Sequence, residues 1–383
     1  MERLTPAELK DLITSVFSPS IRDKRLLIMV DVPDKTSPDN LKWQMRRSLA
    51  ADWFHQLKLV KDELHFEQVD ILYYQNVHNN NADLPEIGYF CQDDPAALNM
   101  TTLKQNGVAV NFAELLSKTQ LVIAPTQFSA TAPLKLLAKQ HQFRAATMPG
   151  FSPEMIPALR LDYNQINQRV TTIKQLLDDA TAMDIIFSVA SGNQHQVHFD
   201  LRFRSGHASG GRFPDAGTAG NLPSGESYIV PYEGETGEKS ESSGVLPVQF
   251  EDEIVLYQIE ENIAQKVISS GRFSVQEAQK IQQEPAYGNI AEIGFGVLKD
   301  FGVNPTGEIL LDEKLGLHIA FGRSDHFGGR VGVADFTSPE NVVHIDRIYI
   351  PETQDQVIPE KVSLTFDQGQ TKILMENNNY TIF

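Results

Sequence analysis

The sequence has almost no cysteine, since Cys91 is the single one among 383 residues. The chain can therefore form no intrachain disulfide, and it has no cysteine cluster for structural zinc or an iron–sulfur centre. Any bound metal would have to be held by histidines and carboxylates. A chain without disulfides fits a reducing compartment, and we expect this protein in the cytoplasm.

Long apolar runs and basic clusters are missing as well. Apolar runs such as residues 26–30 and 121–124 are far shorter than the roughly 20 residues of a membrane span, and the charged start MERLTPAELKD lacks a signal-peptide core. The 33 Lys and Arg against 50 Asp and Glu give a charge of −17, which opposes binding to phosphate backbones. No Gly-rich phosphate-binding motif follows a predicted strand. We expect neither a membrane nor a nucleic-acid partner.

The length predicts two domains, at about 100–200 residues each, and the sequence pattern changes near residue 180. Residues 1–180 alternate strand and helix signals, which predicts an α/β domain with a mostly parallel sheet. Its expected strands cover 26–30, 69–74, 108–112 and 121–124. Its expected helices cover 131–141, 153–180 and a segment that starts at Ser37-Pro38 and runs to 59.

Residues 181–383 consist mainly of short β-prone runs and Gly-containing turns, with one expected helix near 275–282. This pattern predicts an α+β domain with largely antiparallel strands. The expected strands cover 184–189, 197–203, 227–230, 254–259, 308–311, 317–321, 342–350 and 362–366. Residues 205–225 and 233–244 have the composition of loops.

Polar groups that can bind metal are embedded in these apolar strands. Glu226 ends the segment NLPSGE, Glu292 lies in IAEIGFG, and His318 lies in LGLHIAFG. His344 and Asp346 form the segment VHID, and alternation along a strand places both on one face, which suits two ligands of one ion.

Burial of such groups costs several kcal/mol each unless a partner compensates, and a metal centre would do so. Glu226, Glu292 and Asp346 contribute −3, so two divalent cations at +4 and one hydroxide at −1 give a sum of zero. The charge count thus favours two ions over one. Taken alone, an H-x-D pair is more often a plain hydrogen-bonded pair, and only the combination of the motifs points to a metal.

The ordered series NLPSGE, AEIGFG, DEKLGLHIAFG and HID resembles the ligand series of the thermophilic aminopeptidase family, the dinuclear metallopeptidases of the aminopeptidase T, aminopeptidase S and PepS type. The resemblance implies two divalent ions (zinc, cobalt or manganese), one bridging carboxylate, and release of N-terminal amino acids from peptides by a metal-activated water. It also implies a homodimer. The metal ligands it implies are Glu226, Glu292, His318, His344 and Asp346.

The sequence departs from this family at one position. The family carries a tyrosine seven residues after the histidine of HIA-x-G, where this chain has Asp325, followed by His326. Asp325 could accept hydrogen bonds from a substrate ammonium, and His326 could donate to a developing oxyanion. The candidate catalytic residues are therefore Glu226, Glu292, Asp325 and His326.

A different reaction class stays open. The same resemblance extends to ring-cleaving dioxygenases of dihydroxypyridines, which use one Fe(II), and His318, His344 and Asp346 supply the two histidines and one carboxylate that such an iron needs. The substrate would then be a small aromatic molecule. A third possibility is a homologue without catalytic activity.

Overall fold

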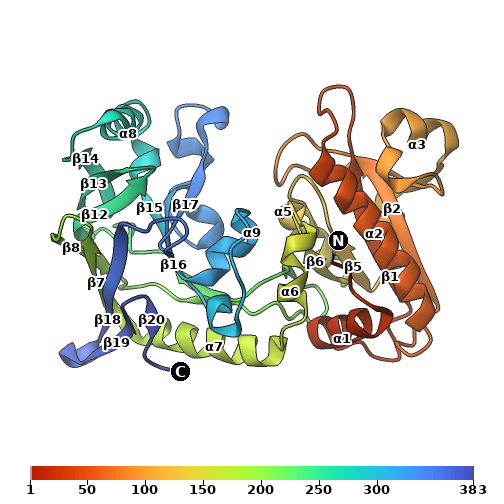
Figure 1. Cartoon of the computed structure of the whole chain (residues 1–383), viewed down its shortest axis with the longest axis horizontal. Helices are drawn as coiled ribbons and strands as arrows, with labels where there is room; N and C mark the ends of the chain where they lie inside the picture. The colour runs from red at the N-terminus through yellow and green to blue at the C-terminus, as the bar shows by residue number, and fades with distance from the viewer. Residues whose placement is uncertain (1) are drawn as a thin grey trace. The chain divides into compact units, whose positions relative to one another are not determined.

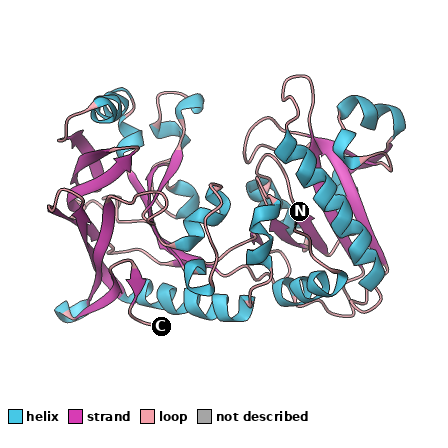
Figure 2. Cartoon of the chain, in the orientation of Figure 1, coloured by secondary structure: helices cyan, strands magenta, loops and turns pink. Residues whose placement is uncertain are grey.

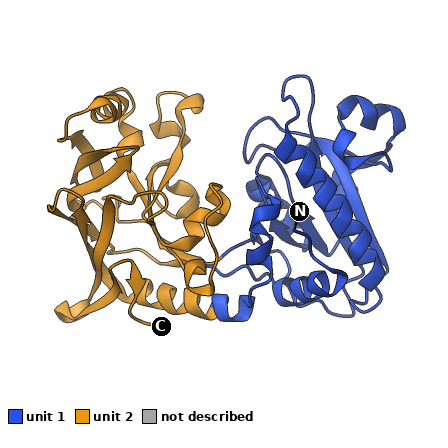
Figure 3. Cartoon of the chain, viewed as in Figure 1, with its two compact units in different colours: residues 1–167, 209–224 blue, residues 168–208, 225–383 orange. Residues whose placement is uncertain are grey.

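The computed structural model describes residues 2–383 and divides into two compact units (Figures 1 and 3). Residues 1–167 and 209–224 form unit 1, and residues 168–208 and 225–383 form unit 2. The domain boundary expected at residue 180 stays a prediction, because this grouping describes packing and not independent folding. Within residues 2–383, no helix combines the length and the apolar character that crossing a membrane requires.

Unit 1 is built on one mixed sheet (Figure 2). Five of its strands are parallel, and β3 and β4 pair antiparallel at one edge. The strand order is β10 (Ala219–Asn221), β6 (Arg144–Thr147), β5 (Leu121–Ala124), β1 (Arg25–Val32), β2 (Gln68–Gln75), β3 (Ile87–Phe90) and β4 (Val108–Asn111).

Helices cover both faces of the central strand β1. Leu27 and Met29 belong to a buried cluster with residues of the helices α4 and α5, while Leu26 and Ile28 on the opposite face are also buried. A central strand that is covered on both faces has a continuous run of apolar residues, as the sequence indicated for residues 26–30. The helices are α1 (Pro6–Phe17), α2 (Leu41–Val60), α3 (Met100–Asn106), α4 (Phe112–Ser117), α5 (Thr131–His141) and α6 (Ile156–Leu159).

Two predicted helix boundaries are wrong. Helix α2 starts at Leu41 and not near Ser37, because the Asn40 side chain accepts a hydrogen bond from the Trp43 N–H at 2.9 Å and caps the helix there. The helix expected over 153–180 is interrupted, and α7 (Tyr163–Asp179) begins only after Asp162, whose carboxylate accepts the Asn164 N–H at 2.9 Å.

Unit 2 contains two sheets. The larger is antiparallel in all its pairings. Its order is β14 (Ile263–Val267), β13 (Glu253–Glu260), β12 (Ser243–Phe250), β8 (Gln194–Asp200), β7 (Ala180–Val189), β18 (Val357–Phe366), β19 (Thr371–Glu376) and β20 (Asn379–Tyr380).

The smaller sheet of unit 2 carries the candidate site, and we call it the site sheet. Its order is β17 (His344–Ile348), β16 (Leu317–Gly322), β15 (Ile290–Gly296), β11 (Glu226–Ile229) and β9 (His207–Ser209). The Phe321 ring packs on Tyr257 of the larger sheet at 5.0 Å between ring centroids, so one face of the site sheet forms core. Helix α8 (Arg272–Gln283) contacts β13 and β14.

Two further sequence expectations differ from the structure. Residues 308–311, expected as a strand, lie mostly in the short helix α9 (Ile309–Asp312), because the Asp312 carboxylate accepts the N–H groups of Thr306 and Gly307 and closes a turn. The segment 205–225, expected as loop, contains β9 and β10, and β10 extends the sheet of unit 1. The chain is thus a mixed α/β protein with a mixed sheet and antiparallel sheets, as expected at that level.

Candidate metal centre

One face of the site sheet gathers all five predicted metal ligands. Residues that pair across antiparallel strands share a face, and alternate residues along each strand share it too. Tyr228 pairs with Gly294, Gly294 pairs with His318, and Glu292 pairs with Ala320, which pairs with Asp346. This register places Glu226, Glu292, His318, His344 and Asp346 on the face opposite the core.

Small residues leave room for the ligands on this face. Gly294, Gly296, Ala320 and Gly322 alternate with apolar residues that face the core. A Cβ atom on Gly294 would lie 1.9 Å from Nε2 of His318, so the imidazole occupies the space that the missing side chain leaves. The spacings E-x-G-x-G and H-x-A-x-G are the sequence signal of this arrangement.

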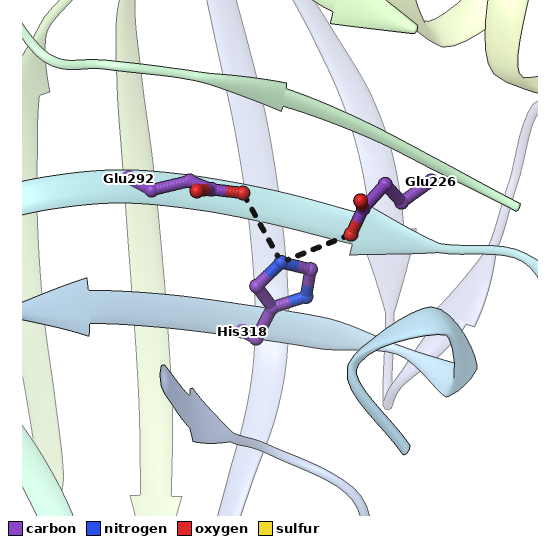
Figure 4. A group of neighbouring side chains, drawn as sticks. All are labelled: Glu226, Glu292 and His318. Atoms are coloured by element: carbon purple, nitrogen blue, oxygen red, sulfur yellow. Dashed lines mark ion pairs between the residues drawn. The ribbon is translucent and has the colours of Figure 1, made fainter. Parts of the chain in front are cut away.

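Glu226, Glu292 and His318 form the first group of potential ligands (Figure 4). Nε2 of His318 lies 3.4 Å from Oε1 of Glu292 and 3.5 Å from Oε2 of Glu226. These separations exceed a normal hydrogen bond and match the distance of about 3.4 Å between donors that each lie about 2.1 Å from a tetrahedral ion.

Glu292, His344 and Asp346 form the second group. Nε2 of His344 lies 3.3 Å from Oε2 of Glu292 and 3.7 Å from Oδ1 of Asp346. Each oxygen of Glu292 therefore faces a different histidine. Glu292 belongs to both groups, which are the ones formed within residues 2–383.

Both histidines are oriented by their second ring nitrogen. Nδ1 of His344 lies 2.8 Å from the carbonyl oxygen of Arg323, and Nδ1 of His318 lies 3.3 Å from that of Gly316. An Nδ1–H that donates to a carbonyl leaves the Nε2 lone pair directed at the carboxylates, which is the arrangement that metal-binding histidines adopt. Three carboxylates and two imidazoles are donors that suit zinc, cobalt or manganese, so these residues fit a divalent metal.

The charges of the cluster shift the pKa values of its members. Burial disfavours the charged imidazolium, but the nearby carboxylates of Glu292, Glu226 and Asp346 outweigh it and raise the pKa of His318 to about 9. Burial likewise raises the pKa of Glu292, but His318 and His344 overcome it and hold that pKa below its ordinary value. Without an ion, protons on the histidines balance the carboxylates, and a cation would replace those protons.

Two charged neighbours of the cluster stand side by side in the sequence, at Glu313 and Lys314. Nζ of Lys314 donates to Oε1 of Glu226 at 2.5 Å and to Oε1 of Glu313. Burial, together with the charges of Glu226 and Asp346, raises the pKa of Glu313 to about 8 against the effect of Lys314. The sequence gave no signal for Glu313, which lies in the polar segment DEK before His318.

Asp325 and His326, the candidate catalytic residues after β16, have different surroundings. Asp325 is bound by Arg323, whose Nε donates to its Oδ1 at 2.5 Å, and its side chain is 37% exposed. His326 packs edge-on against His344 at 5.2 Å between ring centroids, beside Phe327. Burial, followed by the charges of His344 and Arg323, lowers the pKa of His326 to about 4. Their catalytic roles stay predictions.

A buried carboxylate fastens the loop that carries these residues. Glu233 accepts hydrogen bonds from Oγ of Ser324 at 2.6 Å, from Nδ2 of Asn289 at 2.7 Å and from the N–H of Arg330. Asn289 immediately precedes β15, so Glu233 ties the loop 323–331 to the strand that carries Glu292. The sequence gave no sign of this role, because Glu233 lies in a segment with loop composition.

Three other histidines of unit 2, His195, His198 and His207, lie outside both groups. His198 contacts Asp184 at 3.0 Å, and the side chain of His195 projects from the same strand β8. His207 stacks on the Tyr228 ring with centroids 4.9 Å apart and donates from Nε2 to the Phe327 carbonyl at 3.0 Å.

We expect Gly294→Ala to disturb the centre strongly. The added methyl group cannot share space with the His318 imidazole, so the ring must move away from both glutamates. The variant should lose at least about tenfold in metal affinity and about 1–3 kcal/mol of stability through overpacking. Competition with a chelator and a denaturant titration measure the two effects, and an unchanged metal affinity would contradict the placement of His318.

Comparison with known proteins shows the fold. No protein-family model matches the chain, and no curated protein matches its sequence significantly. It is similar in structure to 2,5-dihydroxypyridine dioxygenase from Pseudomonas putida KT2440, with a TM-score of 0.60 and 13% identity over 99% of each chain. It is also similar to wild-type AmpT from Thermus thermophilus, with a TM-score of 0.55 and 11% identity over 98% of this chain and 99% of the other. At these identities the likeness establishes a shared fold and does not by itself assign a reaction.

Proposed function

We propose that this protein is a hydrolase with two divalent metal ions that removes N-terminal amino acids from peptides. One observation carries the proposal: Glu292 belongs to both three-residue groups, with one oxygen toward His318 and the other toward His344. A carboxylate between two pairs of donors is the arrangement that bridges two ions. The fold shared with AmpT supports peptide hydrolysis as the reaction.

In this proposal Glu226 and His318 hold one ion, His344 and Asp346 hold the other, and Glu292 bridges them. Geometry supports the number of ions better than charge counting does. Because Lys314 pairs with Glu226, the three carboxylates and this lysine sum to −2 and no longer require +4 for balance. The evidence for two ions is instead that the two ligand groups share Glu292, and this evidence does not depend on the charge balance.

Divalent ions at such a site polarise a carbonyl oxygen and lower the pKa of water to near neutrality. The protein's own residues prepare the site for this chemistry. The carbonyls of Arg323 and Gly316 fix the two imidazoles, and Lys314 fixes the Glu226 carboxylate. His326 and Phe327 stand beside His344 and limit the space where a substrate chain can lie. Asp325 remains the proposed partner of a substrate ammonium, which would replace Arg323 as the donor to its carboxylate.

Metal analysis and a substrate panel test the proposal together. The purified protein, loaded with zinc, cobalt or manganese, should hold about two ions per chain and cleave some member of a panel of amino-acid p-nitroanilides. N-acetylated versions of the same compounds should resist cleavage, because the proposed reaction needs a free amino group. Two bound ions without cleavage of any compound would refute the peptidase reaction, and one bound ion would refute the bridging role of Glu292.

The dioxygenase is the second candidate, and the fold shared with 2,5-dihydroxypyridine dioxygenase favours it. It requires His318, His344 and Asp346 to hold one Fe(II) together. These three do not form one of the ligand groups found within residues 2–383, where each histidine is grouped with Glu292. Anaerobic loading with Fe(II), followed by oxygen uptake with 2,5-dihydroxypyridine, tests this reaction directly. The cytoplasmic location and the homodimer remain proposals, and the mass in solution tests the homodimer.

A further inference from the structure

Tyr228 shares the face of the site sheet that carries the metal ligands. It follows Glu226 by two residues on β11, and its Cα partner across the sheet is Gly294. The next residue in this row is His318, whose imidazole leans over Gly294. No side chain stands between Tyr228 and His318 in the row, so the phenol borders the space in which the potential ligands converge.

The ring of Tyr228 is held in place from two sides. His207 stacks on it with an interplanar angle of 18° and centroids 4.9 Å apart, and Phe327 contacts it edge-on at 4.8 Å. The Phe327 ring also lies 5.4 Å from that of His344. A chain of aromatic contacts thus connects the phenol to a ligand of the second group and fixes the direction of its ring.

The hydroxyl group of Tyr228 is free to bind something else. Among residues 2–383 its oxygen makes no hydrogen bond to another residue, and it is not one of the fully buried polar atoms without a partner, so it is accessible to water or to a bound molecule. A phenol is protonated at neutral pH, so this group can donate a hydrogen bond there. An oriented, unoccupied donor at a reaction centre suits an oxygen that gains negative charge.

We propose that Tyr228 is a catalytic residue whose phenolic O–H donates a hydrogen bond to the carbonyl oxygen of the substrate as negative charge develops on it. This proposal rests on the proposed hydrolase function and adds the donor that its reaction needs. The bond strengthens between the bound substrate and the transition state, so its loss affects turnover more than substrate binding.

Tyr228→Phe tests the hydroxyl alone, because phenylalanine keeps the ring between His207 and Phe327. With the best p-nitroanilide of the wild type, kcat should fall by about 100- to 1000-fold, as for loss of one oxyanion donor, with KM within about twofold. The phosphinic analogue of the matching dipeptide, which imitates the tetrahedral oxygens, should bind about 100-fold more weakly by calorimetry. Binding of the product amino acid and the metal content should not change. Tyr89→Phe in unit 1 is the matched control and should match the wild type in all these measurements.

The outcomes separate this proposal from the proposed function. If the wild type cleaves peptides and Tyr228→Phe shows the same kcat and the same phosphinate affinity, the role of Tyr228 is refuted while the hydrolase stands. If Tyr228→Phe loses its metal or unfolds, the residue is structural and the proposal is likewise refuted. If the wild type neither cleaves a peptide nor binds the phosphinate, the hydrolase itself fails, and the proposed role of Tyr228 fails with it.

Discussion

Replacing Glu292 with glutamine is expected to abolish hydrolysis and to lower the metal content from about two ions per chain to one or none. Glutamine keeps the size of the side chain but replaces one oxygen by an amide NH₂, which cannot bind a cation. Because Glu292 faces both His318 and His344, one substitution damages both groups. The rate should fall by at least about a thousandfold, since metal polarisation contributes several kcal/mol to transition-state stabilisation and each 1.4 kcal/mol is tenfold.

Metal analysis after dialysis against trace zinc, together with p-nitroanilide hydrolysis, measures both effects. Glu277→Gln is a matched control, because Glu277 is also buried but binds Tyr257 and Lys280 near the opposite face of the site sheet. It should keep both ions. Unchanged metal content and activity in Glu292→Gln would show that the two groups do not form one centre.

The ligand set could be predicted from the sequence because strand alternation is a short-range rule. In H-x-D the two side chains necessarily share a face, and in IAEIGFG and LHIAFG the apolar residues mark the opposite face. Once β11, β15, β16 and β17 pair in register, the polar residues converge. The register itself depends on packing between distant segments, which no local pattern specifies.

The parts of the site that the sequence did not reveal depend on such distant contacts. Tyr228 and Glu313 have no distinctive local pattern, and they matter only because β11 pairs with β15 and Lys314 reaches Glu226. Glu233 lies in a stretch of loop composition, yet it fastens the loop 323–331. The same reason explains the error at residues 308–311, where β-prone residues form a helix because Asp312 closes the preceding turn.

Replacing Lys314 with methionine is expected to destabilise the metal-free protein by about 3–5 kcal/mol, the usual cost of removing one partner of a buried ion pair. The side chains of Lys314 and Glu226 are 2% and 9% exposed, so Glu226 would lose its ion-pair partner in a site with little access to water. For a unit of about 200 residues this loss corresponds to a melting temperature lower by about 6–20 °C.

Lys239→Met isolates the effect of burial. Its ion pair with Glu261 has the same N–O distance of 2.5 Å, but the two side chains are 81% and 51% exposed. An exposed pair contributes at most about 1 kcal/mol, so this variant should melt within a few degrees of the wild type. Equal losses of stability in both variants would show that burial does not strengthen the Lys314–Glu226 ion pair.

A divalent ion should reduce the penalty of Lys314→Met. An ion bound by Glu226, Glu292 and His318 would supply the positive charge that the lysine had provided, and binding to the folded state adds stability as the concentration of the ion exceeds its dissociation constant. Melting curves of the variant and the wild type in chelator and in excess zinc measure this coupling. The difference between the two proteins should be smaller in zinc. If the difference is the same in both solutions, Glu226 does not share its charge with an ion, and the first group is an ion-pair cluster instead of a metal site.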